Sequence, residues 1–315
     1  MSAQPKPSIP KPPKTILLFT YTTCYLPYLL FMIAVQGAGY LEPEESRALH
    51  SSIPMLLANL YMLIAPGVFY WYCMKKITSY DGSEESIKQA NYFYKIFLWF
   101  ASVAPALVLF ICVLLGALSS GIDFANGFGI PIMLTTISSY FSVGTLSYVK
   151  LNTSLSRYMK FVKIRKEQMA LKMSRFAQIV ACQTLIGMAF SVLAPSMKLM
   201  SLEYGEKLNY MAFYIFPTTV LTIIIGTIAN HANMREKQRL IDNLSNFVTR
   251  ISNGDYTESH IDVETRDNLG LTIHSLNKFT KTSIDLLGSI QESGNTSTAT
   301  AFQLKSNVKH ISDDI

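Results

Sequence analysis

Charge is scarce in this sequence, and its scarcity excludes an ordinary soluble domain. Only 15% of the 315 residues are Asp, Glu, Lys or Arg, whereas soluble domains carry about 25%, and the mean hydropathy is +0.26. Charged residues are nearly absent from a series of stretches before residue 227 and frequent after residue 233. The composition therefore predicts a membrane block followed by a polar region.

The sequence also lacks the patterns of disulfide frameworks, metal sites and common enzymes. Its four cysteines have no paired spacing and all fall in apolar stretches: Cys24, Cys73, Cys112 and Cys182. No P-loop, HExxH, CxxC or dinucleotide-binding fingerprint is present. We therefore expect a protein that is not an enzyme and needs no cofactor or metal. No domain interleaves basic and aromatic residues outside the apolar stretches, so we expect no nucleic-acid partner.

Long apolar runs are abundant in the first 230 residues. Six windows reach the roughly 17–25 residues that cross a bilayer, and none contains Asp, Glu or Arg. They are residues 15–36, 53–74, 96–118, 127–149, 176–199 and 210–229. The sequence thus predicts an all-α protein in which residues 15–230 form a membrane domain of six spans. A Pro- and Lys-rich tail, residues 1–14, precedes it.

Basic residues in the connecting segments predict the orientation of these spans. The segment SSGIDFA before the fourth window has no Lys or Arg, whereas eight follow that window. They are Lys150, Arg157, Lys160, Lys163, Arg165, Lys166, Lys172 and Arg175. Because basic loops stay in the cytoplasm, we expect a multi-pass protein of the cell (inner) membrane with both termini cytoplasmic. Attraction to anionic lipid of the bilayer explains the net charge of +6.

Uncharged polar residues at membrane depth have two interpretations. Gln36, Asn59, Tyr140 and Gln183 either line a ligand pocket or hydrogen-bond neighbouring helices. Ion and proton transporters usually carry a charged residue inside the membrane, and the only candidate, Lys198, lies at the edge of its window. The pattern therefore disfavours transport of ions or protons.

Two helical seams flank a polar connector after the last window. Leu240, Leu244, Phe247 and Ile251 follow the 4-3-4 spacing of a helix that packs in a coiled coil. The same alternation resumes after the connector without an insertion. It runs through Leu269, Ile273, Leu276, Thr280, Ser283, Leu287, Ile290, Gly294, Ser297, Ala301, Leu304, Val308, Ile311 and Ile315.

The connector itself contains signals for its two ends and its middle. Gly254 can adopt the positive φ that ends a helix, Asp255 can accept from nearby amides, and Asp267 is placed to cap the second helix. Ile261 and Val263 alternate in an otherwise polar segment, which predicts an extended strand of chain anchored in a groove. About a dozen extended residues can return along a short helix, so both helices are expected to run parallel.

These residues together resemble a HAMP domain, the relay module of bacterial transmembrane sensors. The resemblance covers residues 231–284 and includes Gly254-Asp255, Asp267-x-x-Gly270 and Leu276-Asn277. It implies a parallel four-helix bundle in a homodimer and a set of relay residues. They are Leu244, Phe247, Ile251, Gly254, Ile261, Val263, Asp267, Gly270, Ile273 and Leu276. Two features depart from the family: the first helix lacks its initial proline, and Asn268 replaces the usual Glu.

Residues 285–315 are similar to the start of the adaptation helix in methyl-accepting chemotaxis proteins. The shared features are Ser, Thr and Ala on sustained heptads and the pair Gln291-Glu292 among small residues. The resemblance makes Gln291 and Glu292 candidate methylation sites, although such a pair is also ordinary on a solvated surface. The printed sequence ends at Ile315, before the signalling tip of that family. In a full-length receptor, a histidine kinase and a coupling protein would be the partners.

We therefore expect a chemoreceptor-type transducer, homodimeric and capable of larger arrays, in which six membrane helices pass a stimulus through the HAMP unit to a cytoplasmic coiled coil. Two alternatives stay open. One is the input half of a membrane-bound adenylate or guanylate cyclase or of a sensor histidine kinase. The other is a transporter or channel with a coiled-coil dimerisation tail.

Overall fold

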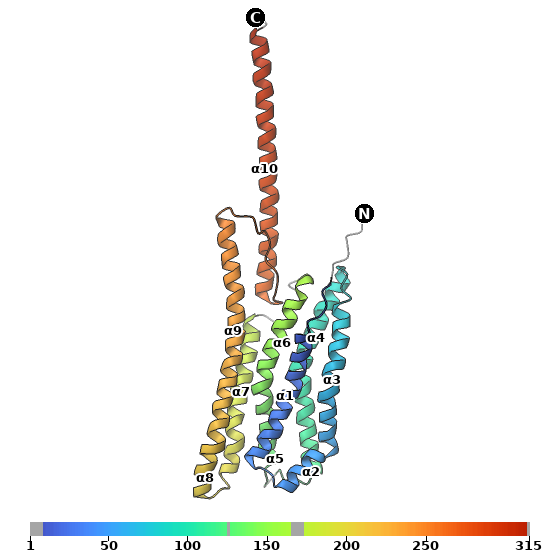
Figure 1. The fold of residues 1–315 in the computed structure, drawn as a ribbon, viewed down its shortest axis with the longest axis vertical. Helices are drawn as coiled ribbons and strands as arrows, with labels where there is room; N and C mark the ends of the chain where they lie inside the picture. The colour runs from blue at the N-terminus through green and yellow to red at the C-terminus, as the bar shows by residue number, and fades with distance from the viewer. Residues whose placement is uncertain (1–8, 125–126, 165–172, 314–315) are drawn as a thin grey trace.

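The computed structural model describes residues 9–124, 127–164 and 173–313, and these form helices with no strand among them. Figure 1 shows the bundle and the long helix that projects from it. The helices are α1 (Lys14–Ala38), α2 (Pro43–Ser51), α3 (Ile53–Ile77), α4 (Glu84–Ser119), α5 (Gly129–Ser139), α6 (Thr145–Tyr158), α7 (Met173–Leu199), α8 (Tyr204–Tyr210), α9 (Phe216–Ser252) and α10 (Asn268–Asp313). Short π-helical segments, η1 (Tyr140–Gly144) and η4 (Met211–Ile215), join α5 to α6 and α8 to α9, and a 3₁₀ turn, η2 (Met159–Phe161), ends α6.

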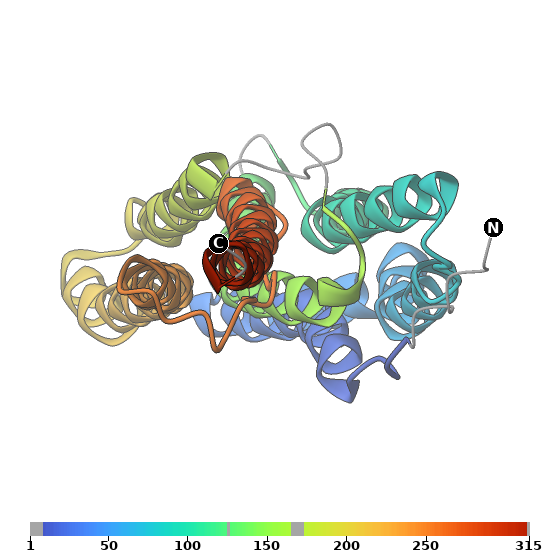
Figure 2. The ribbon, with the colours of Figure 1, turned by 90° about the horizontal axis from the view of Figure 1, so that it is seen from above.

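All six predicted spans are confirmed as helices long and apolar enough to cross a membrane. They are Lys14–Ala38, Ile53–Ile77, Glu84–Ser119, Gly129–Phe161, Phe176–Leu199 and Tyr204–Ser252. We call Gly129–Phe161 (α5, η1, α6 and η2) the central rod and Tyr204–Ser252 (α8, η4 and α9) the peripheral rod. In Figure 2 the peripheral rod lies at one margin of the bundle.

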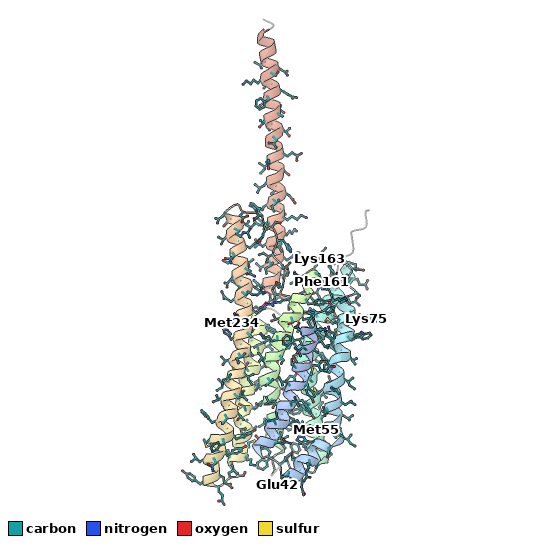
Figure 3. All side chains as sticks on the ribbon, in the orientation of Figure 1. Glu42, Met55, Lys75, Phe161, Lys163 and Met234 are labelled. Carbon is teal, nitrogen blue, oxygen red and sulfur yellow. The ribbon has the colours of Figure 1, made fainter. Side chains whose placement is uncertain are left out.

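The bundle has two distinct ends. Glu42 and Met55 lie at the end formed by α2 and α8, whereas Lys75, Phe161 and Lys163 lie at the end from which α10 projects (Figure 3). We call these the α8 end and the α10 end. Four of the basic residues that predict the orientation lie in the half of the bundle near the α10 end: Lys150, Arg157, Lys160 and Lys163. Arg165, Lys166 and Lys172, like Lys6 of the tail, lie outside the described residues, as does the side chain of Arg175.

Buried apolar side chains hold the membrane helices together. One cluster near the α10 end includes Ile16, Phe97, Leu151 and Leu155, all fully buried. A second cluster near the α8 end includes Phe31. Large apolar residues also cover the outside of the bundle, and the faces of α1, α3 and α4 are rich in exposed Leu and Ile. Helices that are apolar on all sides are typical of membrane spans, because lipid solvates the outer face.

The chain reverses direction twice beyond the bundle. The peripheral rod continues past the α10 end as an uninterrupted helix to Ser252. Residues 253–267, which we call the connector, then return to the bundle, and α10 begins there and runs in the same direction as α9 (Figure 1). Gly254 has the predicted positive φ, 79°. Asp255 Oδ1 accepts from the Thr257 N–H at 3.0 Å, which agrees with its predicted role.

The heptad seam of α10 changes from covered to bare along its length. Ile273 and Thr280 are buried, and Leu276 and Ser283 are half-buried. From Asp285 to Val308 every residue is exposed. The exposed seam positions include Leu287, Ile290, Leu304 and Val308. Side chains at the last two seam positions, Ile311 and Ile315, lie outside the described part of the chain.

Candidate functional site

The residues expected to relay a signal lie where the connector meets α9 and the start of α10. Phe247 and Ile251 are buried on α9, and Leu244 is half-buried beside them in the seam. Ile261 and Val263 are both half-buried, whereas His260 and Asp262 beside them are exposed, as expected of an anchored extended segment. The predicted 4-3-4 face of α9 therefore points inward within a single chain.

Ile261 is fixed by a side chain of α10. Its N–H donates to Asn277 Oδ1 at 2.9 Å, and the Asn277 Nδ2 donates to the Ile261 carbonyl at 2.7 Å. This pair of bonds satisfies both backbone groups of one extended residue, which would otherwise lack partners beside a helix. Leu276-Asn277 was noted in the sequence, but its bonding partner sixteen positions earlier was not.

Asp267 caps α10 and also contacts α9. Its Oδ1 accepts from the N–H groups of Leu269 and Gly270 at 3.1 and 3.4 Å, which is the predicted N-cap arrangement. Its Oδ2 pairs with Lys237 Nζ at 2.6 Å, and only 9% of the Asp267 side chain is exposed. One carboxylate therefore both starts α10 and attaches it to the peripheral rod.

Gly270 lies where no side chain fits. A Cβ atom at this position would be 2.1 Å from the Thr265 carbonyl oxygen and 3.1 Å from Ile164 Cδ1. The first contact is with backbone, so it cannot be relieved by a rotamer change. Glycine therefore allows the first turn of α10 to pack directly on the connector and on the end of the central rod.

Arg266 attaches the connector to the central rod, and sequence reasoning missed it. Its Nη2 donates to the carbonyl oxygens of Met159 and Val162 at 2.6 and 2.5 Å, and its Nη1 to that of Lys163 at 3.2 Å. These carbonyls follow the end of α6, where carbonyls have few intrahelical donors and the helix dipole is negative; the Met159 carbonyl also accepts from the Val162 N–H at 2.9 Å. A cation supplied from the connector therefore caps the central rod.

Burial makes this guanidinium unusual. Arg266 is only 4% exposed, and burial lowers its pKa to about 10, while the nearby Tyr94 and Tyr80 act in the opposite direction. It therefore stays protonated at neutral pH. Its Nε has no hydrogen-bond partner among the described residues. Removing the side chain would leave the Val162 carbonyl without its donor, whereas the Met159 carbonyl would keep the Val162 N–H and the Lys163 carbonyl would keep Asn91 Nδ2. A buried acceptor left without a partner costs about 1–3 kcal/mol.

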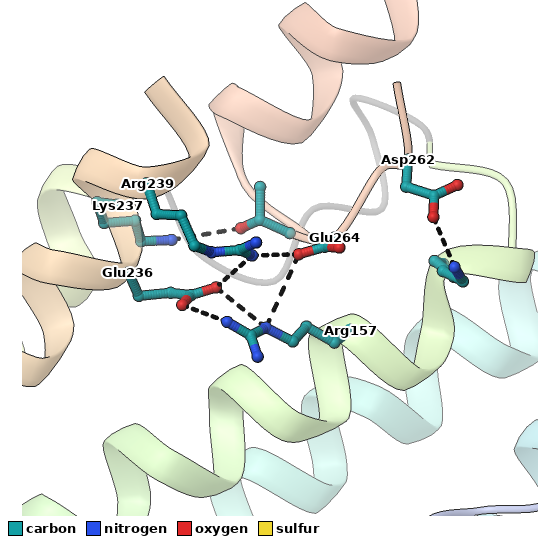
Figure 4. Close-up of polar contacts among 8 residues, drawn as sticks. Arg157, Glu236, Lys237, Arg239, Asp262 and Glu264 are labelled. Atoms are coloured by element: carbon teal, nitrogen blue, oxygen red, sulfur yellow. Dashed lines mark hydrogen bonds and ion pairs between the residues drawn. The ribbon is translucent and has the colours of Figure 1, made fainter. Parts of the chain in front are cut away.

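Ion pairs at the surface join the same three elements (Figure 4). Arg157 on α6 pairs with Glu236 on α9 at 2.5 Å and with Glu264 on the connector at 3.8 Å. Arg239 on α9 contacts both Glu236 and Glu264. Near them, Lys160 pairs with Asp262 at 2.5 Å.

These contacts define one site, which we call the junction. It comprises residues 157–164 at the end of the central rod, 236–239 on the peripheral rod and 262–267 of the connector. Both rods that leave the membrane block are bonded to the segment that starts α10. The junction therefore links the start of α10 to both rods through hydrogen bonds and ion pairs.

The four residues considered for a membrane pocket are not brought together. Tyr140 is buried and donates to the Ala101 carbonyl at 2.8 Å, and Gln183 Oε1 accepts from Thr145 at 3.4 Å. Tyr140 and Gln183 line the same narrow recess. Gln36 and Asn59 are exposed on other faces of the bundle. Helix-to-helix hydrogen bonding, the second interpretation, describes Tyr140 and Gln183.

Gln291 and Glu292, the candidate methylation pair, are both exposed on the bare part of α10. No group of His, Cys, Asp and Glu that could hold a metal ion occurs in residues 9–124, 127–164 and 173–313. No family model, no curated protein and no solved structure matches this chain.

Proposed function

We propose that this protein is a chemoreceptor-type transmembrane signal transducer. Six helices in the cell (inner) membrane receive a stimulus, and residues 231–284 act as a HAMP relay that passes a change in helix position to a cytoplasmic coiled coil. The α10 end faces the cytoplasm, because most basic residues of the connecting segments lie there, whereas α2 and α8 at the other end contribute Arg47 and Lys207. No bond is made or broken in this scheme.

The return of the connector to the bundle carries this proposal. A helix that merely tethered a cytoplasmic tail could continue outward from Ser252, yet α10 begins again at the bundle and is bonded to both rods through Asp267 and Arg266. Parallel helices with a returning connector are the expected arrangement of the relay family. Such a unit can switch between two packings when one of its helices shifts.

The bare seam of α10 supports a homodimer. Leu287, Ile290 and Leu304 are 49–67% exposed in one chain and repeat with heptad spacing. A second copy aligned in parallel would cover them, as in two-stranded coiled coils. In the full-length receptor, this coil would lead to the histidine kinase and coupling protein, and dimers could assemble into arrays.

Cross-linking between chains tests the dimer. With the four native cysteines replaced, Leu304→Cys should form a disulfide between chains on mild oxidation, because seam positions in a parallel pair approach the Cα separation of about 7 Å that a disulfide tolerates. Ser306→Cys, two positions away on the outer face, is the matched control and should react far more slowly. Equal rates at the two positions would refute the parallel coiled coil.

Labelling from outside the cell tests the orientation. In the same cysteine-free background, a membrane-impermeant thiol reagent should label Ser119→Cys, exposed at the α8 end. It should not label Ser79→Cys, exposed at the α10 end, until the membrane is permeabilised. The opposite pattern would place the junction outside the cytoplasm and overturn the proposal.

A further inference from the structure

A small hydroxyl-lined cavity lies between the two rods, in the half of the bundle near the α8 end. It has a volume of about 70 Å³ and is bordered by α1, α5, η1, α7, η4 and α9. No charged residue lines it. A buried water needs roughly 10–15 Å³ of such space, so the cavity can hold a molecule of about five to seven non-hydrogen atoms.

Most hydroxyl groups around this cavity already use their protons. Ser142 donates to the Ser138 carbonyl at 2.7 Å, and Thr222 donates to the Thr218 carbonyl at 2.9 Å. The same holds for Ser138, Ser191 and Thr218, whose hydroxyls donate to backbone carbonyls at 2.7–2.9 Å. Each hydroxyl has one proton and two lone pairs. The cavity therefore offers acceptor lone pairs and few free donors.

The backbone on both sides of the cavity departs from regular α-helix. Ser142 belongs to η1 and Tyr214 to η4, the two π-helical segments. A π-segment inside a membrane helix frequently marks a functional site, because it costs helix geometry. Close packing keeps η1 in place: a Cβ at Gly187 would lie 2.9 Å from Ser142 Oγ and 3.1 Å from the Ser142 N.

We propose that this cavity binds a small uncharged molecule that donates hydrogen bonds. Acceptor-rich walls complement a donor, and a charged ligand would be buried without a counter-charge, which is costly at membrane depth. Water fits the same walls, so a test must distinguish a solute from water alone.

The position of the cavity links it to the proposed function, on which this step rests. Ser142 lies on the central rod, and Thr222 lies on the peripheral rod. Both rods are bonded to the connector at the junction, through Arg157 and Lys237 among others. A ligand between the rods would change their separation at one end of two continuous helices, and the junction would receive the change. The cavity is therefore the stimulus site.

Cysteine protection tests the ligand class. In the cysteine-free protein in proteoliposomes, Ser191→Cys on the cavity wall is modified by methyl methanethiosulfonate in the presence of formamide, acetamide, urea or ethane-1,2-diol. At least one of these donors should slow the modification threefold or more and saturably. N,N-dimethylacetamide, which lacks N–H groups, and acetate, which is charged, should not. Ser196→Cys, on the same helix but outside the cavity, should be unaffected; if Ser191→Cys does not fold, Ser139→Cys replaces it.

Three results would overturn the site: no protection by any donor, equal protection by N,N-dimethylacetamide, or a cysteine that reacts only after denaturation. The protecting solute is then added to the Leu304→Cys variant, and its rate of cross-linking between chains should change at least twofold. Protection with an unchanged rate would refute the stimulus role and leave a binding site. A Leu304→Cys protein that never cross-links would refute the dimer, while protection at Ser191→Cys would still report on the cavity.

Discussion

The two rods that reach the junction are packed very differently. In the most apolar stretch of the central rod, 67% of the residues are buried, whereas the figure for the peripheral rod is 11%. A helix held on most sides has few alternative positions, and a helix at the margin has many. We infer that the central rod is the fixed reference and that the peripheral rod moves relative to it. In the proposed relay, the connector, which is bonded to both rods, registers the difference.

The attachments of the connector to the two rods also differ in burial and in chemistry. Arg266 is buried against backbone carbonyls of the central rod. The Lys237–Asp267 pair on the peripheral rod is shielded, with side chains 14% and 9% exposed. A second attachment to the central rod, the Lys160–Asp262 pair, is about half exposed, at 50% and 51%. Three substitutions therefore test the comparison, and hydrogen exchange of the Leu269, Gly270 and Leu271 amides reports the local stability of each variant.

The largest effect is expected for Arg266→Ala. It removes three hydrogen bonds from a charged donor and leaves the Val162 carbonyl without a partner, so the free energy of local opening should fall by about 3 kcal/mol and exchange should accelerate roughly a hundredfold. Arg266→Lys keeps the charge, but an ammonium group cannot reproduce the planar geometry of two donating nitrogens, so it should recover less than half of the loss. Full recovery by lysine would mean that charge, and not capping of the rod, fixes the connector.

A smaller effect is expected for Lys237→Met. Asp267 would lose its partner on the peripheral rod but keep the N–H groups of Leu269 and Gly270, so we expect a loss of about 2 kcal/mol in the same assay. Lys237→Arg preserves the charge and should behave almost as the parent protein. A loss equal to that of Arg266→Ala would contradict the inference that the central rod is fixed and the peripheral rod moves.

The smallest effect is expected for Lys160→Met. Half-exposed ion pairs are screened by water and salt and contribute about 0–1 kcal/mol. Hydrogen exchange should rise about twofold at low salt. It should be indistinguishable from that of the parent protein near 0.5 M salt, where the Debye length is only a few ångströms. An effect that persists at high salt would show that Lys160 acts by packing.

The sequence predicted the parts of this structure that depend on local patterns. The six spans follow from apolar length, the end of α9 near Gly254 from the freedom of glycine, and the start of α10 from the cap at Asp267. Each signal needs only neighbouring residues. The anchoring of Ile261 was also expected, because apolar residues in a polar extended segment seek a groove.

The role of Arg266 could not be predicted in this way. Its acceptors are separated from it by 103 to 107 positions, and in the sequence it is one more charge in a polar connector. The hydroxyl-lined cavity could not be predicted either, because Ser and Thr in membrane spans usually hydrogen-bond to the preceding turn wherever they occur. These Ser and Thr residues form a site only because α5, α7 and α9 pack against one another. Gly270 was noted for its spacing, yet the reason for it, the Thr265 carbonyl, is a tertiary contact.

The cap on the central rod also has a consequence for synthesis. Val162 and Arg266 are separated by 104 positions, and a ribosome adds about 5–20 residues per second, so the end of α6 waits on the order of 5 to 20 seconds for its donor. During that interval the Val162 carbonyl lacks the donor that it has in the folded chain. The end of the fourth span is therefore completed only after the sixth span has been synthesised, because its donor, Arg266, follows that span in the chain.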